Sequence, residues 1–396
     1  MKLAKRVLEL EPSVTLEATA KAKALKDSGV DVIGLTVGEP DFATPKNIQD
    51  AAIAAIKSGA ASFYTPATGI LPLKQAIVDY LKRQYKTDYT TSQVVVTTGA
   101  KFALYCLFQA ICDEGDEVII PTPYWVSYGE QVGLADGVPV LVKGNEANEF
   151  KVTVEQLEAA RTDKTVAILL NSPTNPTGMI YTRDELEAIG NWAVKNDILI
   201  IADDIYGELV YNGNEWFPIS GISDAIKENT IVINGVSKTW SMTGWRVGYA
   251  VGPLPIIKAM ADIISQATSN LTTASQYAAI EALNGPTDSI IEMREAFEAR
   301  LNEAYPLVTA IPGFKLDKPR GAFYLFPNVR EALDKMGYDD VNDFVNDLLE
   351  IAHVGVVTGA GFGHEDNIRL SYASDIEKIK EGIRRIHEFV ESKIND

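Results

Sequence analysis

The chain has few of the residues that build disulfide frameworks and metal sites. Among 396 residues there are two cysteines and three histidines. Cys106 and Cys112 are six positions apart in one apolar stretch, which suits reduced, buried thiols better than a disulfide or a metal knuckle. The three histidines are scattered and have no zinc-ligand spacing. We therefore expect that the protein has no metal centre and that it works in a reducing compartment.

Positive charge and long apolar runs are also scarce. The 36 lysines and arginines are outnumbered by 54 acidic residues, for a net charge of −18. A field of that sign repels nucleic-acid backbones and anionic lipid, so we expect neither as a partner. No apolar run approaches the length of a membrane span, and the opening MKLAKRVLELEPS has no apolar signal core. These features predict a cytoplasmic protein, in which cations gathered in a pocket would be informative.

Apolar strands alternate with amphipathic helices between about residues 90 and 255. Several strands are continuous apolar runs, as expected where helices cover both faces of a sheet. The predicted strands cover residues 94–97, 117–120, 139–142, 166–170, 198–202, 231–234 and 246–251. Helices are predicted over 100–111 and 183–196, the second opened by a capping box from Thr182 to Glu185. The pattern predicts an α/β fold with a mostly parallel seven-stranded sheet between helices.

The length of the chain favours more than one hydrophobic core. We expect a large domain over residues 46–295 and a small α/β domain over 296–396, with a long helical connection over residues 255–300. The small domain should have strands near 322–326, 354–357 and 368–372, and the segment 1–45 should pack with it.

Polar residues follow several predicted strands, at the edge where α/β sheets bind ligands. Gly99, Ala100 and Lys101 open a helix, whose free N–H groups suit an anion. Trp125 follows the next strand and offers a flat face, and Asn175 lies in the turn NSPTNPTG. A plain helix start, a core tryptophan and an ordinary turn would each account for one of these motifs alone.

Charged residues mark two further strand ends. Asp203 follows the apolar run ILIIA, with Tyr206 three positions later, and a buried carboxylate requires a cation or a good donor. Lys238 and Arg246 lie among small residues in NGVSKTWSMTGWRVGYA, between two apolar runs. Pyridoxal 5'-phosphate needs all of these groups: a lysine for its aldehyde, an acid for its ring nitrogen, an aromatic neighbour and an anion site. The combined set predicts this cofactor.

Two other functions have less support. TGAGFG, residues 358–363, has the spacing G-x-G-x-G with no clear helix behind it. We interpret it as a flexible turn, so an NAD-dependent dehydrogenase lacks its motif. A regulator that binds pyridoxal phosphate would need an added DNA-binding helix-turn-helix, for which the residues before GEPDF leave no room.

These motifs resemble the class I aminotransferases of fold type I, most closely the bacterial aspartate aminotransferases of the gamma subgroup. The resemblance runs over nearly the whole chain in the family order. It is carried by GEPDFATP, YTPATGI, PYWVSY, NSPTNPTG, DDIY, GVSKTWSMTGWRVG and RLSYA. It implies a fold-type-I transferase and a homodimer with shared active sites, which moves the amino group of L-aspartate to 2-oxoglutarate in a ping-pong cycle.

The resemblance also implies roles at the cofactor. Lys238 would hold it covalently and then act as the general base, and Asp203 would pair with the ring N–H. Tyr206 and Asn175 would hydrogen-bond the ring's phenolic oxygen, and Trp125 would stack on the ring. The phosphate would be bound by Gly99, Ala100, Lys101, Ser237, Arg246 and, from the neighbouring subunit, Tyr64.

At the substrate, the resemblance implies that Arg369 binds the α-carboxylate as a bidentate fork. Gly38, Trp125 and Asn175 would border the same pocket, and Lys101, Ser13 and Thr15 would read the distal carboxylate. Members that also act on prephenate tend to carry a lysine where this chain has Glu11, which argues against prephenate activity. Aromatic, alanine and broad-range aminotransferases share the same catalytic residues, as do some lyases and synthases, so these alternatives stay open.

Overall fold

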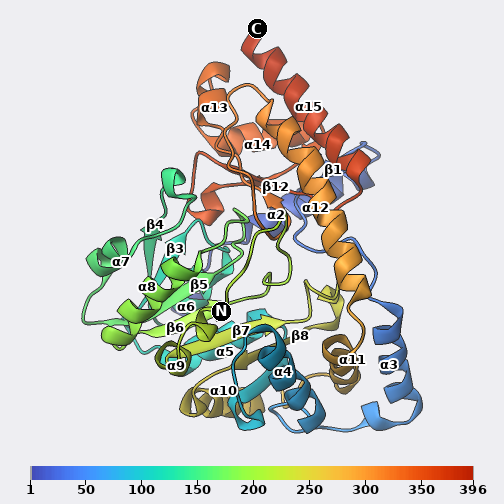
Figure 1. The fold of residues 1–396 in the computed structure, drawn as a ribbon. Helices are drawn as coiled ribbons and strands as arrows, with labels where there is room; N and C mark the ends of the chain where they lie inside the picture. Colours follow the sequence, from blue (N-terminus) through green and yellow to red (C-terminus); the bar gives the residue numbers. More distant parts are fainter. Residues whose placement is uncertain (1, 396) are drawn as a thin grey trace.

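A seven-stranded sheet forms the centre of the computed structural model, which describes residues 2–395 (Figure 1). The strand order is β2-β8-β7-β6-β5-β3-β4. The strands are β2 (Val94–Thr98), β3 (Glu117–Thr122), β4 (Val138–Lys143), β5 (Thr165–Asn171), β6 (Leu199–Asp203), β7 (Thr230–Gly235) and β8 (Val247–Val251). The predicted mostly parallel sheet is confirmed, with β8 antiparallel to both of its neighbours.

Helices cover both faces of this sheet, which explains the continuous apolar runs. Val118 and Ile120 pack with α5 (Ala100–Ile111) and α10 (Leu254–Ala267). Ile119, between them in β3, faces the other way and packs with residues of α8 (Arg183–Lys195). Successive side chains of a strand alternate between faces, so a sheet buried on both sides needs apolar residues at every position.

Local interactions determine where α8 and β8 begin. At the start of α8, Thr182 Oγ1 accepts from the Glu185 N–H at 3.3 Å, and Glu185 Oε2 accepts from the Thr182 N–H at 2.7 Å, so the predicted capping box is present. The last strand begins at Val247, one residue later than predicted, because Arg246 has a left-handed φ of 55°.

The predicted helical connection after residue 255 is three separate helices: α10, α11 (Thr273–Asn284) and α12 (Asp288–Thr309). The helix α11 packs against α3 (Lys46–Lys57) and α4 (Leu71–Gln84). The helix α12 continues through residues 295 and 296, where the sequence predicted a domain boundary, so that division stays a prediction. Within residues 2–395, no helix is both long and apolar enough to cross a membrane.

The C-terminal residues build two smaller sheets. One has the antiparallel order β11-β12-β9, and in the other β1 and β10 are parallel. These strands are β1 (Ile33–Gly34), β9 (Tyr324–Leu325), β10 (Val354–Gly355), β11 (Val357–Thr358) and β12 (Ile368–Ser371). The N-terminal segment thus reaches this part of the molecule through β1, and helix α2 (Val14–Asp27) contacts β10 and β11.

The remaining helices lie around these sheets (Figure 1). They are α1 (Lys5–Leu8), α6 (Ser127–Leu134), α7 (Val154–Ala160), α9 (Asp224–Glu228), α13 (Arg330–Met336), α14 (Val341–Glu350) and α15 (Ile376–Asn395). The glycine-rich stretch interpreted as a flexible turn contains a short 3₁₀ helix, Ala360–Phe362. It is ordered by Phe362, which is fully buried and packs edge-on against Phe326 with ring centroids 5.9 Å apart.

Candidate active site

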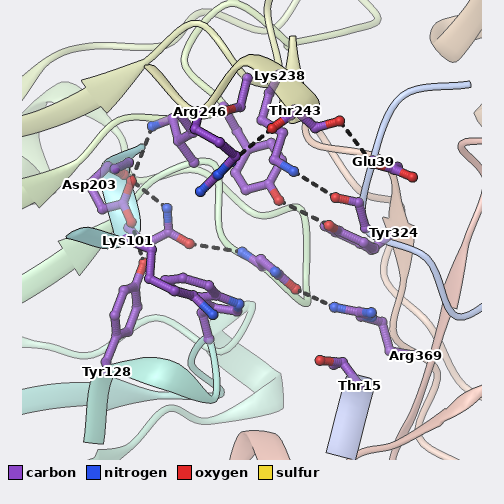
Figure 2. Close-up of a pocket in the computed structure, with 18 residues that line it drawn as sticks. Thr15, Glu39, Lys101, Tyr128, Asp203, Lys238, Thr243, Arg246, Tyr324 and Arg369 are labelled. Carbon is purple, nitrogen blue, oxygen red and sulfur yellow. Dashed lines mark hydrogen bonds between the residues drawn. The ribbon is translucent and has the colours of Figure 1, made fainter. Parts of the chain in front are cut away.

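A cavity of about 280 Å³ lies beyond the carboxyl ends of β5, β6 and β7 (Figure 2). Because β8 is antiparallel to its neighbours, its first residues, next to Arg246, also lie at this edge. The cavity is lined by Thr15, Gly38, Glu39, Ala100, Lys101, Trp125, Tyr128, Asn171, Asn175, Asp203, Ile205, Tyr206, Ser237, Lys238, Thr243, Arg246, Tyr324 and Arg369. Most of the residues predicted for the site are therefore brought together in one place.

Three of the predicted residues do not line this cavity. Gly99 lies directly behind it, where a Cβ would be 2.4 Å from Nη2 of Arg246. Ser13 shares a hydrogen bond of 3.0 Å with the hydroxyl of Thr15. Tyr64 is 90% exposed on the surface. The role predicted for Tyr64 concerns a neighbouring subunit and stays a prediction.

Lys238 has the properties of a reactive amine. Its Nζ donates to the carbonyl oxygen of Gly38 at 2.6 Å. Burial lowers the pKa of Lys238 to about 8; the positive charges of Arg246 and Arg369 add to this shift, whereas Glu39 opposes it. A lysine with this pKa is partly neutral near physiological pH, so it can act as a nucleophile or a base.

Asp203 is a buried carboxylate at the end of β6. Its Oδ2 accepts a 2.7 Å hydrogen bond from the phenol of Tyr128, and its Oδ1 accepts from the Ile205 N–H at 3.2 Å. Burial raises the pKa of Asp203 to about 6, while these hydrogen bonds and Lys238 act in the opposite direction. The carboxylate is thus ionised at neutral pH in a place that favours a nearby N–H⁺ partner.

The start of α5 and the Lys238 loop form a cradle for an anion. The helix opens at Ala100 after Gly99, whose φ is 82°, and no side chain caps it. Arg246 is fixed by a 2.8 Å hydrogen bond from Nη1 to the carbonyl oxygen of Thr243, and its Nη2 lies beside Gly99. Uncapped helix N–H groups, an arginine and the hydroxyl of Ser237 are a donor set that suits a phosphate.

Arg369 lies on the opposite wall and is 2% exposed. Its Nη1 donates to Asn175 Oδ1 at 3.0 Å and its Nη2 to the Thr36 carbonyl at 2.8 Å. Its Nε has no hydrogen-bond partner among residues 2–395, so this buried guanidinium keeps a free donor. Its Cζ lies over the rings of Tyr324 and Phe362, 4.5 Å and 5.0 Å from their centroids. A fixed, incompletely paired guanidinium suits a carboxylate ligand.

A second cation lies across the cavity from Arg369. The Nζ of Lys101 is 4.7 Å from the ring centroid of Trp125. Burial lowers the pKa of Lys101, and Arg246 adds to the effect. The hydroxyl of Thr15 also lines the cavity, as Figure 2 shows. The two cations could hold the two ends of a short dicarboxylate.

The sequence did not single out six lining residues: Glu39, Tyr128, Asn171, Ile205, Thr243 and Tyr324. Two of them could have been found. Asn171 ends β5, where the strand-end rule applies, and its Nδ2 donates to the Asp203 carbonyl at 2.8 Å. Tyr128 follows Trp125 within PYWVSY. Nothing in the sequence marks Tyr324, which lies in a short strand outside the central sheet.

Comparison with known proteins identifies the family. Residues 30–386 match the family Aminotransferase class I and II. The chain is 61% identical over 390 residues to the asparagine–oxo-acid transaminase of Streptococcus mutans serotype c, with 98% of this chain and 99% of that protein covered. It is 57% identical over 388 residues to the aspartate aminotransferase of Bacillus sp. strain YM-2, again with 98% and 99% covered.

Solved structures agree with these relatives. The aspartate aminotransferase from Rhizobium meliloti has a TM-score of 0.94 at 38% identity and covers 99% of each chain. The aspartate aminotransferase from Thermus thermophilus with maleate has a TM-score of 0.93 at 39% identity and covers 98% of this chain and 99% of that one.

Enzymes of this kind use pyridoxal 5'-phosphate, and the cavity fits that group. Lys238 could hold its aldehyde, the buried carboxylate of Asp203 its ring nitrogen, and the cradle at Gly99 and Arg246 its phosphate. The chain belongs to the class I and II aminotransferase family and is a transaminase that depends on pyridoxal 5'-phosphate.

Proposed function

We propose that the enzyme transfers the amino group of L-aspartate to 2-oxoglutarate, giving oxaloacetate and L-glutamate in a two-stage ping-pong cycle. The observation that carries this is the pair of cations, Arg369 and Lys101, that line one cavity and lie apart from each other in it (Figure 2). Both substrates and both products are dicarboxylates. Relatives named aspartate aminotransferase at 57%, 55% and 54% identity support the proposal, and they are bacterial, which suits the gamma subgroup.

Substrate binding follows from the two cations. The planar guanidinium of Arg369 pairs with the α-carboxylate, and Lys101, with the Thr15 hydroxyl, pairs with the distal one. An apolar side chain in place of the distal carboxylate would leave Lys101 desolvated without an anion, which is unfavourable.

The proton is moved by Lys238. When bound, the cofactor supplies an electron sink for the negative charge that develops at the substrate Cα. The neutral amine of Lys238 takes the proton from that Cα, a kind of transfer that typically contributes ~10²–10⁴-fold in rate. Its pKa of about 8 leaves a useful fraction of the amine unprotonated near neutral pH.

Other residues of the cavity hold and tune the cofactor. Asp203, supported by Tyr128, would keep a proton on the ring nitrogen, and Tyr206 and Asn175 would hydrogen-bond its phenolic oxygen. Trp125 would stack on the ring. The phosphate would be bound by Ser237, Arg246 and the N–H groups of Ala100 and Lys101, whereas the N–H of Gly99 donates to the Thr97 carbonyl at 2.8 Å.

Asparagine is a second candidate donor, because the relative at 61% identity is named an asparagine–oxo-acid transaminase. A carboxamide is neutral and would leave the charge of Lys101 unpaired, so we place aspartate first. The aromatic aminotransferase among the solved structures is less similar, at 36% identity. Relatives named aspartate/prephenate aminotransferase reach 45%, and Glu11 argues against prephenate here.

We also propose a homodimer, in which Tyr64 contacts the phosphate of the neighbouring subunit. Support comes from large apolar side chains that one subunit leaves exposed near this residue: Ile56 is 61% exposed, Phe63 76% and Leu71 65%.

We further propose that the enzyme is cytoplasmic, because the free thiols of Cys106 and Cys112 suit a reducing compartment.

The deciding experiment is a panel of amino donors with 2-oxoglutarate as acceptor. We expect kcat/KM to be highest for L-aspartate, lower for L-asparagine and at least ~10²-fold lower for L-phenylalanine. A preference for asparagine would overturn the proposed donor and leave the chemistry in place. A Lys238→Ala variant with unchanged turnover would overturn the proposed mechanism itself.

A further inference from the structure

Tyr324 is a buried residue of the cavity to which no role has been given. It belongs to β9 and is 1% exposed. Its hydroxyl is 2.9 Å from the hydroxyl of Tyr206, and its ring lies under the guanidinium of Arg369, with Cζ 4.5 Å from the centroid. Figure 2 shows Tyr324 between Arg369 and the residues around Lys238. One side chain thus contacts both the residue proposed for the α-carboxylate and one proposed for the cofactor ring.

The ring face of Tyr324 helps to fix the plane of Arg369. That guanidinium donates from Nη1 to Asn175 and from Nη2 to Thr36. These two hydrogen bonds alone still allow the guanidinium plane to rotate about the line that joins Nη1 and Nη2. Cζ lies over the rings of both Tyr324 and Phe362, and packing against these two rings restricts that rotation. A cation over an aromatic face is also attracted to it, and the attraction is larger where water is excluded.

The hydroxyl of Tyr324 interacts with Tyr206, away from Arg369. If the phenol proton of Tyr206 is directed at the cofactor's phenolic oxygen, Tyr206 can only accept from Tyr324, which becomes the donor of the pair. Donation to the oxygen of a phenol makes that phenol a better donor in turn. A Cβ on Gly38 would lie 2.6 Å from this hydroxyl of Tyr324, so the backbone that accepts from Lys238 packs closely against it.

We propose that Tyr324 is a positioning residue, whose ring face sets the plane of Arg369 and whose hydroxyl directs the Tyr206 phenol at the cofactor. This inference rests on the proposed function, because it requires the roles given there to Arg369 and Tyr206. Its two parts use different atoms of one side chain and can be separated by substitution.

The test compares Tyr324→Phe, which keeps the ring, with Tyr324→Leu, which removes ring and hydroxyl. The control is Tyr372→Phe, since Tyr372 is equally buried and donates to the Ala322 carbonyl at 3.2 Å without lining the cavity. Two quantities are measured on each cofactor-loaded protein: the dissociation constant of maleate and the pH midpoint of the cofactor's long-wavelength absorbance. Thermal unfolding checks that each variant is folded.

We expect Tyr324→Phe to raise the absorbance midpoint by roughly 0.3–1 pH unit, because the Tyr206 donor that stabilises the ring's oxyanion is weakened. Maleate affinity should stay within about twofold. Tyr324→Leu should raise the midpoint similarly and weaken maleate binding by about 3–30-fold. The control should change neither quantity.

The inference is overturned if Tyr324→Phe leaves the midpoint at the control value, or if a folded Tyr324→Leu binds maleate like the control. Should the leucine variant not fold, the absorbance of Tyr324→Phe decides alone. Arg369→Lys separates this failure from that of the proposed function. If Arg369→Lys binds maleate as tightly as the unsubstituted enzyme, the carboxylate role of Arg369 fails, and the inference fails with it.

Discussion

The phenol of Tyr128 donates a hydrogen bond to Oδ2 of Asp203 across 75 residues of sequence, at 2.7 Å. Tyr128 is fully buried in α6 and packs edge-on against Trp125, with ring centroids 5.3 Å apart. Trp125, the proposed stacking ring, lies just before α6, so the start of this helix and the turn that leads into it hold both the ring and the donor to Asp203.

Replacing Tyr128 with phenylalanine should weaken Asp203 as an acid partner. Burial holds the pKa of Asp203 at about 6 and the Tyr128 bond works to lower it, so loss of that bond raises the pKa further. A carboxyl group is charged above its pKa, so the acid limb of the kcat profile should move to higher pH. We expect kcat to fall about 3–10-fold at pH 7 and to recover by pH 8.5. An acid limb that does not move would contradict this role.

The lowered pKa of Lys238 should be visible when cofactor is added to the cofactor-free protein. Only the neutral amine attacks an aldehyde, and burial places the pKa of Lys238 at about 8. The rate of covalent attachment, followed by absorbance, should rise with pH about a midpoint near 8 and level off above pH 9. Lys74→Met, outside the cavity, is the control and should keep that midpoint. A midpoint near 10.5 would show an ordinary lysine.

Burial of the same amine should also lower the stability of the cofactor-free protein. The folded pKa of about 8 lies below the ordinary 10.5, so the stability contributed by Lys238 is complete above pH 10.5 and is lost as pH falls through 8. Lys238→Met should therefore be more stable than the parent at pH 7, by about 2 kcal/mol once partial exposure is allowed for. The gain should shrink toward pH 10.5 in urea unfolding, and a gain independent of pH would point to packing instead.

Gly99 offers a steric test of the anion cradle. An alanine there would meet Nη2 of Arg246 at 2.4 Å and would adopt a φ of 82°. We expect the affinity for pyridoxal 5'-phosphate, measured by equilibrium dialysis, to fall at least ~10-fold.

Gly59→Ala is the matched control for Gly99→Ala, because Gly59 has a φ of 81° with no atom within 4 Å of its added Cβ. Both variants should lose about 1 kcal/mol of stability from the left-handed backbone. Only Gly99→Ala should lose cofactor affinity. Equal affinities in the two variants would remove Gly99 from the site.

The sequence predicted the central sheet and its strand-end residues well, because both follow from local rules. Buried parallel strands are continuous apolar runs, and their carboxyl ends share one edge, which brings Asn175, Asp203 and Lys238 together. Tyr324 could not be predicted in this way. It belongs to a two-residue strand, and its meeting with Tyr206 and Arg369 depends on how the C-terminal part packs on the sheet.

Trp245 shows a different limit of prediction. The sequence suggested only packing for it, but its Nε1 donates to the hydroxyl of Thr44 at 2.9 Å. That hydroxyl in turn donates to the Ser241 carbonyl at 2.7 Å, and the Thr243 hydroxyl donates to Glu39 at 2.8 Å. The loop after Lys238 thus holds the segment 38–44 by hydrogen bonds, across about 200 positions that no local pattern relates.

These contacts determine when, during synthesis, the enzyme can first become complete. The segment 38–44 leaves the ribosome long before Ser241 and Trp245, which hold it by hydrogen bonds. The Thr36 carbonyl can accept its hydrogen bond from Arg369 only after a further 333 residues have been made. At about 5–20 residues per second, the interval between Lys238 and Arg369 alone is roughly 7–26 s. A nascent chain therefore carries its reactive lysine for many seconds before the arginine that would bind a substrate exists.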